Sequence, residues 1–104
     1  MEITYSSRKL EKTLLDKKLI KKEYGKMAQG VMNRMSELRA ATCLKDIPIT
    51  PPPKRHKLEP HTENKWGISY YKNYRIIFSA VGDFNADDLS SITEIKILEL
   101  EDYH

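Results

Sequence analysis

The fold is decided by the stretch Trp66-Gly67-Ile68-Ser69-Tyr70-Tyr71-Lys72-Asn73-Tyr74-Arg75-Ile76-Ile77-Phe78-Ser79-Ala80-Val81. Its two halves, residues 66–71 and 74–81, are rich in aromatic and β-branched side chains, which favour strands. Lys72-Asn73 between them is a short connection of the kind that joins antiparallel neighbours. The stretch therefore predicts a β-hairpin, and it places an arginine, Arg75, inside an otherwise apolar strand.

Three further strands are predicted outside this hairpin, at residues 54–58, 92–100 and, as a short opening strand, 3–5. The proline-rich segment 47–53 cannot be helical and offers few backbone donors to a sheet, so we expect it to be an extended connection. Residues 82–88 have the composition of a polar loop. Four of the five predicted strands thus follow one another in the second half of the chain.

Strand alternation predicts which side chains share a face. In the last strand Ile95 and Ile97 are expected to point inward, whereas Leu98 breaks the alternation and indicates a strand covered on both sides. Tyr70 and Tyr71 are expected on opposite faces, so that at most one of them can line a site.

Two amphipathic helices are predicted in the first half of the chain. The first is capped by Ser6 or Ser7 and runs to about Lys22, and the second continues to about Ala41, with Gly30 tolerated inside it at a modest cost. Their apolar residues recur at helical spacing: Leu10, Leu14, Leu15, Leu19 and Ile20, then Met27, Val31, Met32, Met35 and Leu38. The methionines are interpreted as core or a partner-facing groove.

This order predicts one α+β domain over residues 1–104, in which an N-terminal helical hairpin packs on one face of a mainly antiparallel sheet of four to five strands. The other face of the sheet remains available for function. A composition of 39% hydrophobic and 32% charged residues is compatible with a single compact core.

Composition and motifs exclude several functions. The longest apolar runs fall well short of the roughly 20 residues that span a bilayer, so we expect a cytoplasmic protein without membrane contact. The single Cys43 can form neither an internal disulfide nor a cysteine-based zinc site and is interpreted as a small buried hydrophobe. Phosphate-loop, dinucleotide, zinc-protease and serine-hydrolase signatures are absent, so neither a cofactor nor a metal is expected.

Charge is unevenly distributed along the chain. Residues 1–57 carry 14 Lys/Arg against 6 Asp/Glu, a balance of +8, whereas residues 58–104 carry 4 against 9, a balance of −5. Summed over residues 1–57, this excess favours a polyanionic partner such as RNA, although each lysine taken alone is better explained by a solvated helix face.

The residue types that remain suit RNA cleavage without a cofactor. Histidine can transfer protons near neutral pH, arginine matches phosphate oxygens with its planar fork, and aromatic faces can hold an unstacked base. His56 and Arg75 lie in predicted strands, and the sequence ends in Asp102-Tyr103-His104.

Four segments, in this order and spacing, resemble HigB toxins of the RelE superfamily: Pro53-Lys54-Arg55-His56-Lys57-Leu58, Lys65-Trp66-Gly67-Ile68, Asn73-Tyr74-Arg75-Ile76-Ile77-Phe78 and Ile97-Leu98-Glu99-Leu100-Glu101-Asp102-Tyr103-His104. The resemblance covers most of the chain. It implies a bacterial toxin of a type II toxin–antitoxin system, a ribosome-dependent endoribonuclease that cuts mRNA in the A site. It also implies a HigA-type helix-turn-helix antitoxin that restrains the toxin, with operator DNA contacted only through that antitoxin.

The resemblance also implies roles for single residues. His56 matches the position of a general acid or base, Arg75 that of the residue stabilising the transition-state phosphate, and Asp102, Tyr103 and His104 the terminal cluster that orients substrate and shares proton transfer. Trp66 occupies an aromatic position that we expect to be mainly core. The residues expected to bind RNA are Lys54, Arg55, Lys57, Lys65 and Tyr71.

The chain departs from the family pattern at Glu59, where family members tend to carry a lysine, for which Lys57 or Lys54 could substitute. The loop before Trp66 also differs from the family pattern. These departures leave open a non-catalytic RNA-binding or protein-interaction module of the same fold. A separate alternative, which could coexist with the enzyme, is a corepressor that strengthens operator binding by its antitoxin.

Overall fold

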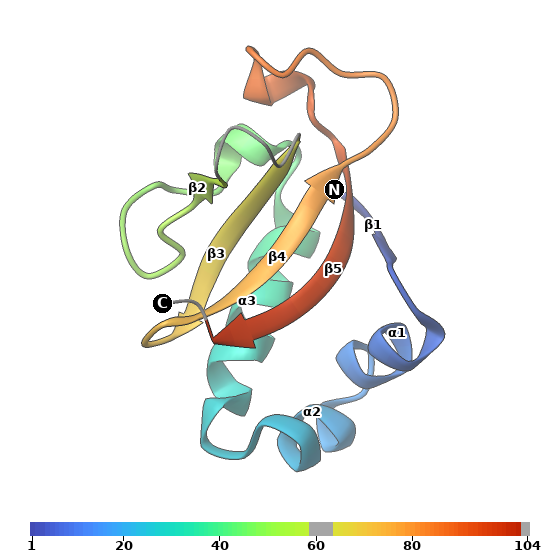
Figure 1. Cartoon of the computed structure of the whole chain (residues 1–104), viewed down its shortest axis with the longest axis vertical. Coiled ribbons are helices and arrows are strands. Elements are labelled where there is room, and N and C mark those ends of the chain that lie inside the picture. The colour runs from blue at the N-terminus through green and yellow to red at the C-terminus, as the bar shows by residue number, and fades with distance from the viewer. Residues whose placement is uncertain (59–63, 103–104) are drawn as a thin grey trace.

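The computed structural model describes residues 1–58 and 64–102, and of Asp102 only the backbone. Five strands form one sheet in the order β1-β5-β4-β3-β2 (Figure 1). Their bounds are β1 Glu2–Tyr5, β2 His56–Lys57, β3 Lys65–Tyr71, β4 Tyr74–Ala80 and β5 Glu94–Asp102. Strand β1 is parallel to β5, and the other three pairings are antiparallel, so the sheet is mixed. The α+β class and the predicted hairpin are confirmed, with Lys72 and Asn73 joining β3 to β4.

Three helices precede β2: α1 Arg8–Leu14, α2 Lys17–Tyr24 and α3 Ala28–Ala40. The single helix predicted up to about Lys22 is therefore wrong. Ser7 caps α1 through a hydrogen bond from Leu10 N, and Asp16 caps α2 through one from Lys18 N. Because the Asp16 carboxylate satisfies a new helix start, the chain turns between Leu14 and Lys17 instead of continuing.

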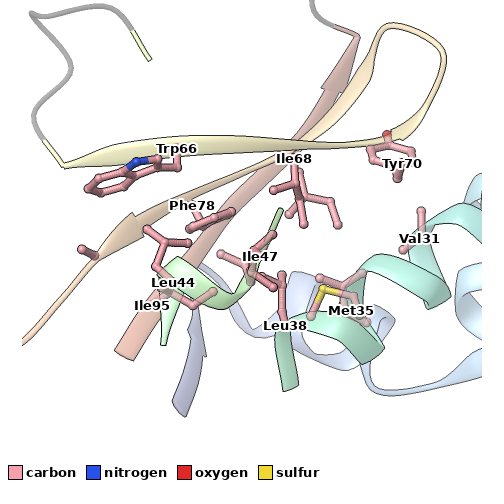
Figure 2. Close-up of a cluster of buried hydrophobic side chains, with 14 of the residues drawn as sticks. Val31, Met35, Leu38, Leu44, Ile47, Trp66, Ile68, Tyr70, Phe78 and Ile95 are labelled. Atoms are coloured by element: carbon pink, nitrogen blue, oxygen red, sulfur yellow. The ribbon is translucent and has the colours of Figure 1, made fainter. Parts of the chain in front are cut away.

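The expected helical hairpin is not confirmed as predicted, because three helices pack in succession, α1 on α2, α2 on α3, and α3 on β3 of the sheet (Figure 1). Val31, Met35 and Leu38 of α3 have no exposed surface; in Figure 2 Met35 and Leu38 lie below Ile68, and Val31 lies below Tyr70. Burial of each such side chain contributes about 1.5–3 kcal/mol. Trp66 is 2% exposed and belongs to this core, as expected.

One glycine lets α3 approach the sheet closely. A Cβ atom built on Gly30 would lie 1.9 Å from the backbone oxygen of Tyr70. The sequence interpretation, that Gly30 is tolerated inside the helix at a modest cost, is therefore incomplete, because the contact between α3 and β3 requires the absence of a side chain there.

Two irregularities in the sheet change the faces predicted from alternation. Register passes from Phe78–Ile97 to Ile77–Glu99, so that Leu98 is an extra residue on β5, the β-bulge that explains its broken alternation. Register also shifts between Ser69 and Tyr71, leaving Tyr70 as an extra residue on β3.

The second irregularity overturns the expectation that Tyr70 and Tyr71 point to opposite faces. The ring of Tyr74 is 6.0 Å from that of Tyr70 and 6.4 Å from that of Tyr71, measured between centroids. Both tyrosines also line the same cavity.

Candidate functional site

The candidate site lies on the open face of the sheet, which we define as the face opposite the helices that carries His56, Gly67, Arg75 and Glu101. Trp66 and Ile68 face the core in Figure 2, so Gly67 between them faces the other way. By register His56 pairs with Gly67, Ser69 with Arg75, and Arg75 with Glu101. Neighbouring strands thus carry these four residues across one face.

His56 and Arg75 are in direct contact, although β3 separates their strands. Nη1 of Arg75 is hydrogen bonded to Nε2 of His56. Arginine has five N–H donors and no acceptor, so Nε2 must accept this bond. The imidazole is therefore neutral, with its proton on Nδ1.

Gly67 provides the space for this contact. A Cβ atom at position 67 would lie 3.1 Å from Cε1 of His56, 3.2 Å from Cδ1 of Ile77 and 3.6 Å from Cδ of Arg75. The side chains from β2 and β4 therefore meet above a strand position that carries none. Ile77, which is 4% exposed, is the apolar side chain beside them.

The surroundings of His56 favour its neutral form. Burial is the first cause that lowers its pKa from the usual 6.5, and the positive charge of Arg75 is the second. Hydrogen bonds to the backbone at Lys54 and Gly67 oppose both effects without reversing them. At neutral pH the ring is consequently a proton acceptor.

A pair of carboxylates on β5 borders Arg75 on its other side. Glu99 pairs with Ile77 and Glu101 with Arg75, so both lie on the open face after the bulge at Leu98. A hydrogen bond with Glu99 is the main cause that raises the pKa of Glu101 to about 6; burial and repulsion by Glu99 add to it, and Arg75 opposes it. Glu101 is thus a carboxylic acid that retains its proton closer to neutrality than usual.

The five residues predicted to bind RNA lie in three places. Lys54 is exposed and lines a cavity together with Tyr71, which is half-buried. Arg55 donates from Nε to the carbonyl of Ile47 at 2.7 Å and so holds the proline-rich connection. Lys57 is exposed, with Nζ 5.7 Å from the centroid of the Trp66 ring, and half-buried Lys65 begins β3.

The predicted terminal cluster is only partly within the described chain. The backbone of Asp102 pairs with that of Tyr74, next to the pairing of Glu101 with Arg75. Its side chain, and all of Tyr103 and His104, lie outside the described residues, as does Glu59. The roles implied for Asp102, Tyr103 and His104 remain predictions.

Sequence reasoning did not identify Glu99, Glu101, Gly67 or Arg34. Glu99 and Glu101 are two residues apart and could have been paired by alternation, but placing them beside Arg75 requires the register set by the bulge. The space at Gly67 and the burial of Arg34 depend on tertiary packing. Arg34, in the middle of a charged helix, resembles a solvated residue in sequence, yet it is 6% exposed.

The described residues contain no group of three or more His, Cys, Asp or Glu side chains arranged to hold a metal ion. Over the same residues, no helix is long and apolar enough to span a membrane.

Comparison with solved structures finds proteins of similar architecture. The chain is similar to a YoeB/ParE toxin from Agrobacterium tumefaciens, with a TM-score of 0.59, 10% sequence identity, and complete coverage of both chains. It is also similar to a chain of a YoeB–YefM complex from Staphylococcus aureus, with a TM-score of 0.55, 16% identity, and coverage of 100% of this chain and 97% of that one.

These similarities show that the chain has the fold of YoeB- and ParE-type toxins, the RelE-like fold that its motifs predicted. No protein-family model and no curated protein sequence matches the chain significantly. The narrower assignment to the HigB group stays a prediction.

Proposed function

We propose that this protein is the toxin of a type II toxin–antitoxin system and acts as a metal-independent endoribonuclease on mRNA bound to the ribosome. The observation that carries the proposal is the contact between His56 and Arg75 on the open face of a RelE-like sheet. A neutral imidazole and a guanidinium fork, side by side, provide a proton acceptor and a bidentate phosphate ligand.

RNA cleavage of this kind requires two proton transfers and one displacement. The 2′-oxygen loses its proton and attacks the phosphorus, the bond from phosphorus to the 5′-oxygen breaks, and that oxygen receives a proton. The products are a 2′,3′-cyclic phosphate and a 5′-hydroxyl. No metal ion is needed if protein groups transfer the protons and balance the charge of the phosphorane.

The described residues can supply each of these requirements. Arg75 leaves Nε2 of His56 for the scissile phosphate, which presents two anionic oxygens to the guanidinium fork. Nε2 then becomes available to accept the 2′-hydroxyl proton. Glu101, with its pKa of about 6, is the group on the far side of Arg75 that can return a proton to the leaving oxygen.

The terminal cluster completes the proposed site. Asp102, Tyr103 and His104 follow directly on the register position that pairs with Arg75. We assign to them the orientation of the substrate and a share in proton transfer, as the resemblance to HigB toxins implies.

The small number of reacting groups in this site supports a mechanism that depends on the ribosome. A ribosome holding mRNA in the A site would orient the scissile phosphate, so that the protein supplies only the reacting groups. One similar structure is a YoeB–YefM complex. By analogy we propose that an antitoxin, of the HigA helix-turn-helix type, restrains this protein in the bacterial cytoplasm and mediates any contact with operator DNA.

The proposal is tested by inducing the chain in a bacterial host, with and without the neighbouring open reading frame, while mapping mRNA 5′ ends. We expect growth arrest with new ends inside translated codons, relieved by the neighbour and abolished by Arg75→Ala. Lys96→Ala is a matched control, because it removes an exposed cation from the same sheet. Normal growth without new ends, from folded wild-type protein, would favour the non-catalytic binding module.

A further inference from the structure

The polar cavity lined by Lys54 and Tyr71 adjoins the candidate site at the edge of the sheet. It has a volume of about 320 Å³ and lies between the segment before β2 and the turn that joins β3 to β4. Because β2 is only two residues long, the end of β3 beyond it is bordered by the proline-rich segment, to which Ser69 N donates a hydrogen bond at Pro53 O of 2.7 Å. Arg75 lines this cavity and also contacts His56, so the two sites share one guanidinium.

The lining of this cavity is cationic. Arg34, Lys54, Lys72 and Arg75 contribute to it, and no acidic residue is among the described residues that line it. These four cations come from four separate segments: α3, the proline-rich connection, the β3–β4 turn and β4. Glu37 pairs with Arg34 and Glu101 interacts with Arg75 from outside the lining, so Lys54 and Lys72 at the rim supply most of the uncompensated positive charge that would attract an anion.

Arg34 of α3 is the buried residue among the cations that line the cavity. Its side chain is 7% exposed and forms a salt bridge of 2.7 Å with Glu37, and both its Nε and the Oε1 of Glu37 are buried without a hydrogen-bond partner among the described residues. A buried guanidinium donor that lacks an acceptor costs free energy in the empty protein. The contact between Gly30 and Tyr70, one helical turn earlier, brings this part of α3 against β3.

The two lysines at the rim adopt a backbone conformation that lysine seldom occupies. Lys54 has φ 49° and Lys72 has φ 44°, in the left-handed region that favours glycine or asparagine. Both lysines are exposed and line the cavity, Lys54 from the proline-rich connection and Lys72 from the β3–β4 turn. The two-residue turn requires this conformation at Lys72, so both positions carry lysine where glycine or asparagine would be favoured.

We propose that this cavity is a phosphate-binding subsite that holds the backbone phosphate of the nucleotide next to the cleaved bond. The inference rests on the proposed function, because it assigns the shared Arg75 to the scissile phosphate and the remaining cations to its neighbour. Lys54 and Lys72 contact the phosphate from the rim, and Arg34 supplies the buried positive charge behind it. Two adjacent phosphates held in this way fix the direction in which RNA crosses the open face.

Binding of an uncleavable RNA probe tests this subsite without requiring catalysis. The probe is a 2′-O-methylated adenylate trinucleotide, titrated into the ¹⁵N-labelled full chain at low salt. We expect the largest amide shifts at Lys54, at Tyr71 to Asn73, and at the Arg34 side chain.

The decisive variant is the double substitution Lys54→Gly and Lys72→Gly. Glycine accepts the left-handed backbone at both positions, so the variant should fold at least as well as the parent while losing both rim charges. It should bind the trinucleotide at least about 10-fold more weakly, since each lost phosphate contact lowers affinity and reduces its salt dependence. The matched control is Lys17→Ala with Lys21→Ala, which removes two exposed lysines from α2 and should change affinity less than about twofold.

An equal loss in the two double variants would show that affinity follows total charge and would overturn the subsite, as would unchanged binding by the glycine variant. Inorganic phosphate that bound the cavity as tightly as the trinucleotide would identify a free-anion site and overturn the RNA assignment. A folded protein that binds the probe here but never cleaves mRNA would retain the subsite and contradict only the proposed enzyme. Cleavage of mRNA by a protein that does not bind the probe in this cavity would overturn the subsite and leave the proposed enzyme standing.

Discussion

Arg75 reaches across β3 to donate a hydrogen bond to Nε2 of His56, and the strand position beneath the two side chains is a glycine. The contact holds the imidazole in one neutral tautomer, and burial together with the charge of Arg75 lowers the pKa of His56. A phosphate that attracts Arg75 would release the proton acceptor at the same moment. Substrate binding and activation of the base would thus be coupled through one hydrogen bond.

Replacement of Arg75 by lysine separates charge from geometry. Arg75→Lys retains the positive charge but loses the planar fork that engages two phosphate oxygens. We expect mRNA cleavage to fall by roughly 100-fold or more, in the range found when a single oxyanion-stabilising donor is removed. Single-turnover cleavage on programmed ribosomes measures this effect. Activity close to that of the parent would show that Arg75 acts as a simple charge and not as a phosphate fork.

The space above Gly67 can be filled by one methyl group. Gly67→Ala places a Cβ 3.1 Å from the His56 ring and 3.2 Å from Ile77, so the imidazole must move by a few tenths of an ångström. We expect cleavage to fall roughly 10- to 100-fold, because displacements of this order disrupt proton transfer. The midpoint of urea unfolding should change little, as it should for the control Ser79→Ala on β4. Full activity of Gly67→Ala would contradict the role assigned to this space.

For the substitution Gly30→Ala, helix propensity and the observed packing predict opposite changes in the free energy of unfolding. Alanine is favoured over glycine inside a helix by about 1 kcal/mol, so sequence alone predicts that Gly30→Ala stabilises the protein. In the structure the new Cβ would overlap the backbone oxygen of Tyr70 at 1.9 Å, which cannot move without separating α3 from β3. We therefore expect destabilisation by about 1–3 kcal/mol in urea unfolding, whereas Ser36→Ala, exposed on the same helix, should not destabilise. An increase in stability on Gly30→Ala would disprove the close approach.

The carboxyl pair on β5 should make stability depend on pH. The pKa of Glu101 is raised to about 6 in the folded protein, so its ionised form is disfavoured there relative to the unfolded chain. This penalty is present in full above pH 6 and disappears as pH falls toward 4.5. Glu101→Gln should therefore stabilise the protein at pH 8 and not at pH 4.5.

The size of this effect is limited by solvent. A shift of this kind corresponds to less than about 1 kcal/mol once the exposure of Glu101 and solvent screening are taken into account. Urea unfolding of Glu101→Gln and the parent from pH 4.5 to 8 measures the difference. A difference that does not vary with pH would mean that Glu99 and Glu101 do not share a proton.

Local chemistry was sufficient to predict much of the sheet. Aromatic and β-branched residues marked β3 and β4, and Lys72-Asn73 marked their turn, because strand composition and turn residues act over short distances. The same local reasoning failed at Asp16, which could be read as one more polar residue of a long helix. In the structure its carboxylate caps a new helix instead.

The candidate site could be predicted only in part. His56 and Arg75 were found through the resemblance, but their contact depends on a glycine in the strand between them. The proximity of Glu101 to Arg75 depends on the extra residue Leu98, which shifts the register of β5. Arg34 was overlooked because burial of a helix position depends on which neighbour covers it, and that neighbour, β3, is distant in sequence.

Cleavage of RNA by this protein can be measured with purified ribosomes that hold one defined mRNA codon in the A site. The wild-type chain should cut inside that codon and leave a 2′,3′-cyclic phosphate and a 5′-hydroxyl, and a single 2′-deoxy substitution at the cut nucleotide or Arg75→Ala should abolish the cut. No cleavage by folded wild-type protein would show that it is not a ribosome-dependent endoribonuclease, and cleavage that persists at the 2′-deoxy nucleotide would exclude attack by the 2′-hydroxyl.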